Sequence, residues 1–286
     1  MRRLIVEIRS GPSKGEKVTL GAGEALRVGR SPRADLALPK DTEMSALHFA
    51  LEWDGAACRL RDLESASGTT LHGRRVEVTA VKNGGWIRAG GTDFMVYIEG
   101  ATPARRRPPD PPELAAKKEQ AIEALLGAGA PLYAVLDAAQ DRRILTLLRE
   151  SVEEHRSLYE GVQGDAMADA APYLVRLSPS LDGRLLRALV QEGWGKSWGI
   201  YFTCRRPFKE VRRHLRRFLI VMAEETRNRL YFRFYDPRVL TEFLPTCTGR
   251  QLTELYGEIE RFWAESEENE VLVFERPGEP PRIGAE

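Results

Sequence analysis

Short runs of apolar residues, each interrupted by glycine, proline, aspartate or asparagine, fill the first hundred residues of the chain. The runs are Leu4 to Ile8, Lys17 to Leu20, His48 to Trp53, Cys58 to Leu60 and Phe94 to Ile98. Many short strands with turn residues between them are typical of an antiparallel β-sandwich. We therefore predict an all-β sandwich over residues 1–100.

The hydrophobic pattern changes period in the second half of the chain. A continuous apolar run, Leu132 to Leu136, is followed by Ile144, Leu147 and Leu148 at helical spacing, and the alternation repeats after Tyr173 and again after Trp198. Strands that alternate with helices indicate an α/β domain with a mixed or mainly parallel sheet. We expect this domain over residues 113–286, with its core motifs at 131–263.

Residues 101–112, "ATPARRRPPDPP", separate the two patterns. Five prolines and three successive arginines neither pair as a strand nor continue a helix, so the segment is interpreted as an interdomain linker. A helix is expected to begin at Asp110 to Glu113 and to end at Gly127.

The stretch Leu230 to Leu240, "LYFRFYDPRVL", combines aromatic, basic and acidic residues. Its alternation predicts a strand over 230–234, and Asp236 and Pro237 predict the cap and first turn of a helix. Arg233, Asp236 and Arg238 then lie at a strand end, where open α/β sheets bind ligands. A purely structural strand-to-helix junction is the alternative. Farther on, Thr248 to Gln251 predicts a capping box.

Composition excludes several classes of protein. No apolar run approaches the roughly 18 residues of a membrane span, so a cytoplasmic protein without a membrane partner is expected. Cys58, Cys204 and Cys247 have no metal-type spacing, and neither a disulfide framework, a metal nor a cofactor is predicted. The net charge of +1 gives no general attraction to nucleic acid, which is not expected as a partner.

Residues Arg205 to Arg217, "RRPFKEVRRHLRR", carry seven basic residues and one acid on a helix with an apolar stripe. The outward face, with Arg212, Arg213 and Arg216, is a candidate dock for an acidic partner. A self-paired face is the alternative, with Glu265, Glu267, Glu268 and Glu270 as the countercharge.

Three spaced motifs mark the first half: Val28 to Ser31, Ser45 to His48, and "DLESASGTTLHG" over residues 62–73. In order and separation they resemble the forkhead-associated (FHA) domain, with its Gly-Arg, Ser-x-x-His and Asp-x-x-Ser-x-Asn-Gly-Thr signature. The resemblance implies a reader of threonine-phosphorylated proteins, in which Arg30 and Ser45 bind phosphate. His48 matches a position that buttresses the loop from inside.

The same resemblance contains a departure. Ser67 replaces the asparagine of the Asn-Gly pair, Ala66 replaces the preceding threonine, and the later Asn-Gly is His72-Gly73. Ser67 is the remaining candidate for peptide contact, with fewer hydrogen bonds than an amide provides. A docking module that does not need phosphate is the competing interpretation.

Five segments of the second half occur in this order: "PLYAVLDAAQ" from Pro131, "APYLVRL" from Ala171, "GWGKSWGIYF" from Gly193, "RRHLRRFLIV" from Arg212 and "RFYDPRVLTEFLPT" from Arg233. They resemble the adaptor-chaperones of bacterial type VI secretion, a family long catalogued only as a domain of unknown function. The resemblance implies a non-enzymatic protein that contacts a toxic effector and the VgrG spike protein onto which the effector is loaded.

Two other functions stay open at this point. One is a phosphothreonine-peptide signalling protein with a divergent second domain. The other is an unrecognised hydrolase, in which Asp137 and Asp236, both at predicted strand ends, form a carboxylate pair. The familiar catalytic motifs are absent from the sequence, which disfavours the hydrolase.

Overall fold

The computed structural model describes residues 2–178, 183–222 and 229–278. The chain divides into two compact units. Unit 1 comprises Met1–Pro103 with Arg149–Val152, and unit 2 comprises Ala104–Leu148 with Glu153–Glu286. The predicted linker has no regular secondary structure before residue 112. None of the helices in the described ranges combines the length and the apolar character needed to cross a membrane.

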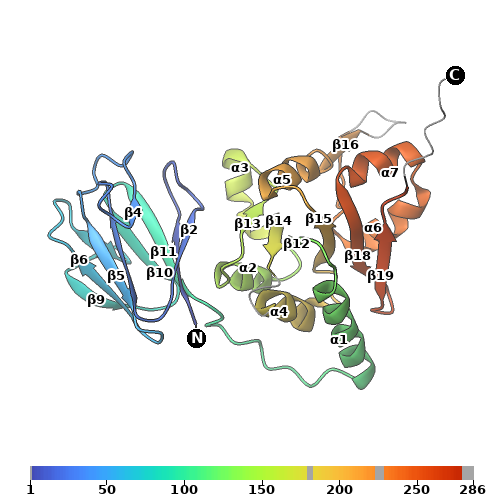
Figure 1. The fold of residues 1–286 in the computed structure, drawn as a ribbon, viewed down its shortest axis with the longest axis horizontal. Helices are drawn as coiled ribbons and strands as arrows, with labels where there is room; N and C mark the ends of the chain where they lie inside the picture. Colours follow the sequence, from blue (N-terminus) through green and yellow to red (C-terminus); the bar gives the residue numbers. More distant parts are fainter. Residues whose placement is uncertain (1, 179–182, 223–228, 279–286) are drawn as a thin grey trace. The chain divides into compact units, whose positions relative to one another are not determined.

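Unit 1 is a sandwich of two sheets (Figure 1). The first sheet has the order β2 (Lys17–Leu20), β1 (Leu4–Ile8), β11 (Thr92–Ile98), β10 (Gly85–Ala89), β7 (Thr69–Leu71) and β8 (Arg74–Val76). The second has the order β4 (Leu36–Ala37), β3 (Glu24–Gly29), β5 (Phe49–Trp53), β6 (Cys58–Asp62) and β9 (Val78–Val81). The predicted all-β sandwich is confirmed.

The two sheets of unit 1 bury their facing apolar side chains against each other. Phe49 of β5 and Phe94 of β11 meet edge to face, with ring centroids 5.3 Å apart. Val28, Leu51 and Val96 complete the same buried cluster. Edge-to-face packing of this kind adds to the hydrophobic stabilisation of the interface between the sheets.

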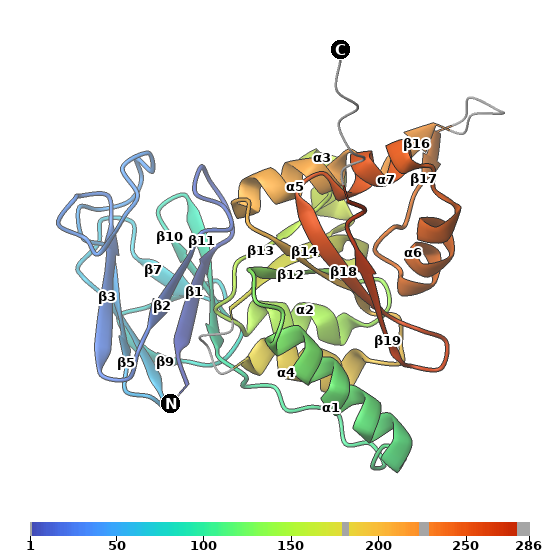
Figure 2. The same ribbon diagram turned by 45° about the vertical axis from the view of Figure 1, so that its right-hand side comes forward.

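Unit 2 contains one six-stranded sheet with helices on both faces (Figure 2). Its strands have the order β13 (His155–Ser157), β14 (Pro172–Leu177), β12 (Leu132–Asp137), β15 (Gly199–Cys204), β18 (Ile259–Glu265) and β19 (Val271–Glu275). A separate hairpin pairs β16 (Ile220–Met222) with β17 (Arg229–Tyr231). The helices are α1 (Pro112–Leu126), α2 (Arg142–Arg149), α3 (Gly161–Ala166), α4 (Arg184–Gly193), α5 (Phe208–Arg216), α6 (Pro237–Phe243) and α7 (Gly249–Tyr256), with short 3₁₀ turns at Ala168–Ala170 and Leu244–Thr246.

Every pairing in this sheet is antiparallel, which corrects the expected mixed or mainly parallel arrangement. The alternation of strands and helices was predicted correctly, but β12 lies between β14 and β15. Since both neighbours run antiparallel to β12, the crossover through α4 joins two parallel strands that do not touch. In the same way, α2 joins β12 and β13 across β14. A strand inserted into each crossover therefore converts the parallel pattern into antiparallel pairing.

The sheet of unit 2 is buried on both faces. Leu132, Ala134 and Leu136 of β12 belong to the cluster that contains the apolar residues of α1, α2 and α4. Tyr133 and Val135 belong to the opposite cluster, with the apolar residues of α5, α6 and α7. This burial on both faces explains why the strand reads as a continuous apolar run in the sequence.

Helix boundaries agree with the predicted caps, with one exception. The Asp236 carboxylate accepts a hydrogen bond from the Arg238 amide at the start of α6, and Thr248 and Gln251 form the capping box of α7. At α1, however, Pro111 occupies the N-cap position, and Asp110 forms an ion pair with Lys118 at 2.6 Å. The strand predicted over 230–234 is also wrong beyond Tyr231, where β17 ends.

The backbone around Gly29 provides a test of this packing. A Cβ atom at residue 29 would lie 2.3 Å from the carbonyl oxygen of Ala46, which belongs to the loop before β5. We expect Gly29→Ala to destabilise unit 1 by about 1 to 3 kcal/mol, since the backbone must move apart. Urea unfolding followed by amide exchange of β3 and β5 measures this change.

Gly21→Ala is the matched control in the same unit. Its added methyl would meet only the flexible end of the Glu24 side chain, at 3.4 Å or more. If the urea midpoints at which β3 and β5 lose amide protection were equal in the two variants, the tight contact at Gly29 would be contradicted.

Candidate functional site

The loops after β3 and before β5 meet at one end of unit 1. The Arg30 amide donates to the Ser45 carbonyl oxygen at 2.9 Å, and the Ser31 amide donates to that of Ala46 at 3.1 Å. Gly29 allows this approach because it has no side chain. The Arg30 side chain is exposed, and no ion pair or hydrogen bond of its guanidinium occurs within the described residues. Its donors are therefore available to an anionic ligand.

His48 connects this loop to the next one. Its Nδ1 accepts from the Ser45 amide at 3.0 Å, so Nε2 carries the proton and donates to the Gly68 carbonyl oxygen at 3.3 Å. The ring is completely buried. His48 consequently holds the two loops in place and has no exposed nitrogen for a ligand.

The loop between β6 and β7 completes the site. Asp62 accepts hydrogen bonds from the hydroxyls of Ser65 and Thr69, both at 2.6 Å. The Ala66 amide then donates to Ser45 Oγ at 2.9 Å. Ser67, the next residue, is exposed. The structure thus brings Ser45 together with the loop of Ser67, on the same end of the sandwich as Arg30.

Arg75 belongs to this surface and was missed in the sequence. A Cβ atom at Gly68 would lie 2.6 Å from Arg75 Cζ, so the guanidinium packs against the backbone beside Ser67. The residue reaches this place because β8 pairs with β7, with Thr70 opposite Arg75. No motif marks the position; only the hairpin register could have indicated it.

In unit 2, Arg233 joins two buried carboxylates. Its Nη2 atom lies 2.7 Å from Asp137 Oδ2 and 3.4 Å from Asp236 Oδ2. Arg238 adds a second guanidinium, 2.8 Å from Asp236. Both aspartates are 2 % exposed, so their charges need these partners. Asp137 and Asp236, the conditional carboxylate pair of the hydrolase hypothesis, are thus both held by one arginine.

Glu265, at the end of β18, holds the loop after α4. Its carboxylate accepts hydrogen bonds from the amides of Gly195 and Ser197. Burial raises the pKa of the Glu265 carboxyl, and the two amides act against this rise. Next to it, the Asp137 amide donates to the Trp198 carbonyl oxygen at 2.8 Å. The buried carboxylates therefore fix the positions of β12, the 193–198 loop, β18 and the start of α6.

The arrangement of Asp137, Arg233, Asp236 and Arg238 favours the structural interpretation of the stretch. No histidine, serine or cysteine side chain among the described residues is hydrogen-bonded to either aspartate, and Asp236 also caps α6. The stretch begins in β17, the second strand of the separate hairpin, and not in a strand of the main sheet, which corrects the predicted placement.

The basic residues of α5 are divided between two sides. Arg212 donates to the Ser157 carbonyl oxygen at 2.8 Å, Arg216 donates to that of Leu158 at 2.9 Å, and both form ion pairs with Glu160. Arg213 is exposed. Of the three predicted partner-binding residues on this helix, two are thus occupied within the protein.

The predicted countercharge for this helix is wrong. Glu160 forms ion pairs with Arg212 and Arg216. Glu258 pairs with Arg206, and Glu260 pairs with Arg205. Glu265 is buried among backbone amides, and Glu268 accepts from the Ser266 hydroxyl. Distance along the sequence was misleading, because β13 and the residues after it pack beside α5.

Comparison with known proteins assigns both halves. The family model DUF4123, a domain of unknown function, matches residues 132–254. A second model, described as the cytoplasmic domain of an inner membrane component of T3SS, matches residues 7–100. The FHA domain-containing protein FhaA of Mycobacterium tuberculosis is 34% identical in an alignment of 97 residues, and the match covers 30% of this chain and 18% of FhaA. The chain thus aligns with less than a fifth of that relative's length.

Two solved structures are similar to the N-terminal half. One comes from a structural and functional analysis of phosphothreonine-dependent FHA domain interactions. It is 29% identical, the match covers 36% of this chain and 99% of that chain, and the TM-score is 0.31. The other is the FhaA FHA domain in a complex. It is 31% identical, the match covers 32% of this chain and 98% of that chain, and the TM-score is 0.30.

Both resemblances drawn from the motifs are confirmed by the family models and the curated relative. The chain joins an FHA domain in its N-terminal half to a DUF4123 domain in its C-terminal half.

Proposed function

We propose that this protein is a non-enzymatic cytoplasmic adaptor that binds a type VI secretion effector and helps to load it onto a VgrG spike. The observation that carries the proposal is the match of residues 132–254 to DUF4123, in a chain whose other half is an FHA domain. In this proposal the DUF4123 domain contacts effector and spike, and the FHA domain docks or regulates the complex.

The charge distribution supports an adaptor over an enzyme. Asp137 and Asp236, the carboxylates considered for proton transfer, are both engaged by Arg233. Arg30 and Arg213, in contrast, are exposed, with no ion pair among the described residues. Open charge therefore lies on surfaces, where it suits recognition of a partner.

For the FHA domain we propose recognition of a threonine-phosphorylated protein. Arg30 supplies a guanidinium and Ser45 a hydroxyl on adjoining loops, and both groups can donate to phosphate oxygens. The solved FHA structures include phosphothreonine-dependent interactions, which supports this choice of ligand. The same geometry favours the second candidate function, a phosphothreonine-peptide signalling protein.

Ser67 gives a gain-of-function test of the FHA site. An asparagine amide both donates and accepts, whereas the serine hydroxyl is shorter. We expect Ser67→Asn to tighten binding of phosphothreonine peptides about tenfold, which corresponds to about 1.4 kcal/mol. Fluorescence anisotropy with a degenerate phosphothreonine-peptide library measures the affinity, and the unphosphorylated library is the reference.

Arg30→Ala should abolish the phosphate-dependent part of this binding, while Arg59→Ala, an exposed arginine on β6, should leave it unchanged. Phosphate-dependent binding that survives Arg30→Ala would contradict the assigned site.

Capture of partners separates the adaptor from the signalling protein. We expect the tagged protein to recover a VgrG-type spike or a toxin from native bacterial lysate, as identified by mass spectrometry. Phosphatase treatment should leave this recovery intact if the DUF4123 domain makes the main contact. Recovery of threonine-phosphorylated proteins alone, lost on phosphatase treatment, would favour the signalling protein and contradict the adaptor.

A further inference from the structure

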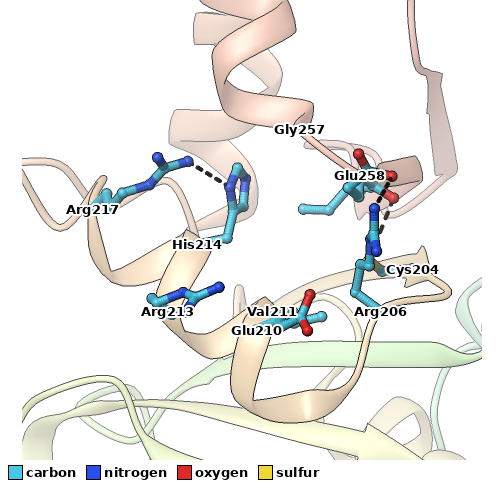
Figure 3. Close-up of a pocket in the computed structure, with 10 residues that line it drawn as sticks. Cys204, Arg206, Glu210, Val211, Arg213, His214, Arg217, Gly257 and Glu258 are labelled. Carbon is cyan, nitrogen blue, oxygen red and sulfur yellow. Dashed lines mark hydrogen bonds and ion pairs between the residues drawn. The ribbon is translucent and has the colours of Figure 1, made fainter.

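A hollow of about 510 Å³ opens beside α5, between this helix and the segment that joins α7 to β18 (Figure 3). Neither the enzyme hypothesis nor the FHA site involves it. Its lining residues are Cys204, Arg206, Glu210, Val211, Arg213, His214, Arg217, Gly257, Glu258 and Ile259. All of them belong to unit 2, so the hollow is a feature of the DUF4123 half alone.

His214 forms part of the wall of the hollow and is held by a hydrogen bond at each ring nitrogen. Its Nε2 donates to the Leu255 carbonyl oxygen at 2.8 Å, and its Nδ1 accepts from Arg217 Nη2 at 2.9 Å. Arginine is only a donor, so the imidazole is neutral with its proton on Nε2. A Cβ atom at Gly257 would lie 2.6 Å from His214 Cε1, and the φ of +51° also favours glycine there. The ring therefore packs closely on Gly257 and positions the Arg217 guanidinium.

The charges around the hollow are unevenly satisfied. Glu258 forms an ion pair with Arg206 at 3.5 Å. Arg217 uses one nitrogen for His214, and its guanidinium carbon lies 5.7 Å from the Phe218 ring centroid. Its other donors have no acceptor within the described part of the chain. Arg213 lies one helical turn before Arg217 and makes no ion pair among the described residues. Two guanidiniums with spare donors, those of Arg213 and Arg217, therefore line the hollow. The one lining acid that is not paired with Arg206 is Glu210.

Arg213 and Arg217 differ from the other basic pair on the same helix. Arg212 and Arg216 also stand four residues apart, but Glu160 neutralises both of them. Arg212 and Arg216 thus attach α5 to the rest of the domain, whereas Arg213 and Arg217 are exposed to solvent. Unpaired guanidiniums at (i, i+4) spacing on one helix face can each donate to a carboxylate.

We propose that this hollow binds an acidic segment of a protein partner, with Arg213 and Arg217 as the residues that contact its carboxylates. The proposal rests on the adaptor function, and it names the surface and the chemistry of one partner. Charge complementarity selects an acidic peptide. A single-stranded nucleic acid would need large aromatic side chains for base stacking, and no phenylalanine, tyrosine or tryptophan lines the hollow.

The direct test uses the full chain and two peptides that differ only in charge. Arginine Nε–Hε resonances are followed by NMR during titration with acetylated, amidated Gly-Glu-Asp-Glu-Gly or its neutral analogue Gly-Gln-Asn-Gln-Gly. We expect saturable shifts at Arg213 and Arg217 with the acidic peptide alone. Equal shifts with both peptides, shifts spread over all exposed arginines, or a stronger response to oligothymidine would overturn the proposal.

Charge reversal tests the same surface with the natural partner. Arg213→Glu with Arg217→Glu should reduce recovery of the spike or effector about tenfold or more, since like charges would then face each other. Arg142→Glu with Arg187→Glu is the matched control, because both residues are exposed in unit 2 outside the hollow and form no ion pair among the described residues. Equal recovery with both double variants would place the partner elsewhere.

The two experiments distinguish failure of the acidic-peptide site from failure of the adaptor function. Peptide shifts at Arg213 and Arg217 without recovery of any secretion component would retain the acidic-peptide site and reject the type VI adaptor. Recovery of spike or effector that is insensitive to charge reversal, with no peptide shifts, would retain the adaptor and reject the hollow. Arg213→Lys with Arg217→Lys keeps the charge and should retain part of the peptide response, which excludes loss of folding as the cause.

Discussion

The C-terminal half depends on one interaction, the bridge that Arg233 forms between the buried carboxylates of Asp137 and Asp236. A carboxylate removed from water needs an opposite charge or several hydrogen-bond donors, and removal of one partner from such a group typically costs about 3 to 5 kcal/mol. Because Asp137 ends β12 and Asp236 caps α6, the bridge fixes the position of a helix against the central strand of the sheet. Glu265 acts in a similar way at β18, where it holds the amides of the loop after α4.

This use of charge within the fold decides what is left for recognition. The acidic and basic residues of the "RFYDPR" stretch satisfy one another, as do Arg212 and Arg216 of α5 and Glu160 of the segment after β13. Arg30 on the FHA loops, and Arg213 and Arg217 beside the hollow, keep guanidinium donors that have no acceptor among the described residues. A protein with paired charges inside and open guanidiniums at two surfaces is suited to hold other proteins, which agrees with the proposed adaptor.

Local signals in the sequence predicted the elements, and long-range pairing accounts for the errors. The caps at Asp236 and Thr248 depend on neighbouring residues and were found where expected. The FHA motifs were predicted with them, because Gly29, His48 and Asp62 are each required by a contact inside the domain. Sheet direction could not be predicted, since the period of a buried strand does not indicate which strand lies beside it. The partners of the basic helix, the role of Glu265 and the position of Arg75 have the same origin: each depends on residues far away in the chain.

The most direct measurement of this account is the unfolding free energy of unit 2 in three variants: Arg233→Met, Asp137→Asn, and the two together. If the bridge holds the fold, Arg233→Met is strongly destabilising, because two buried carboxylates lose their shared cation. The double variant should then be less destabilised than the sum of the single variants, since fewer charges stay unpaired. Additive effects, or an Arg233→Met variant as stable as the wild type, would contradict the claim that these charges serve the fold and leave recognition to the open surfaces.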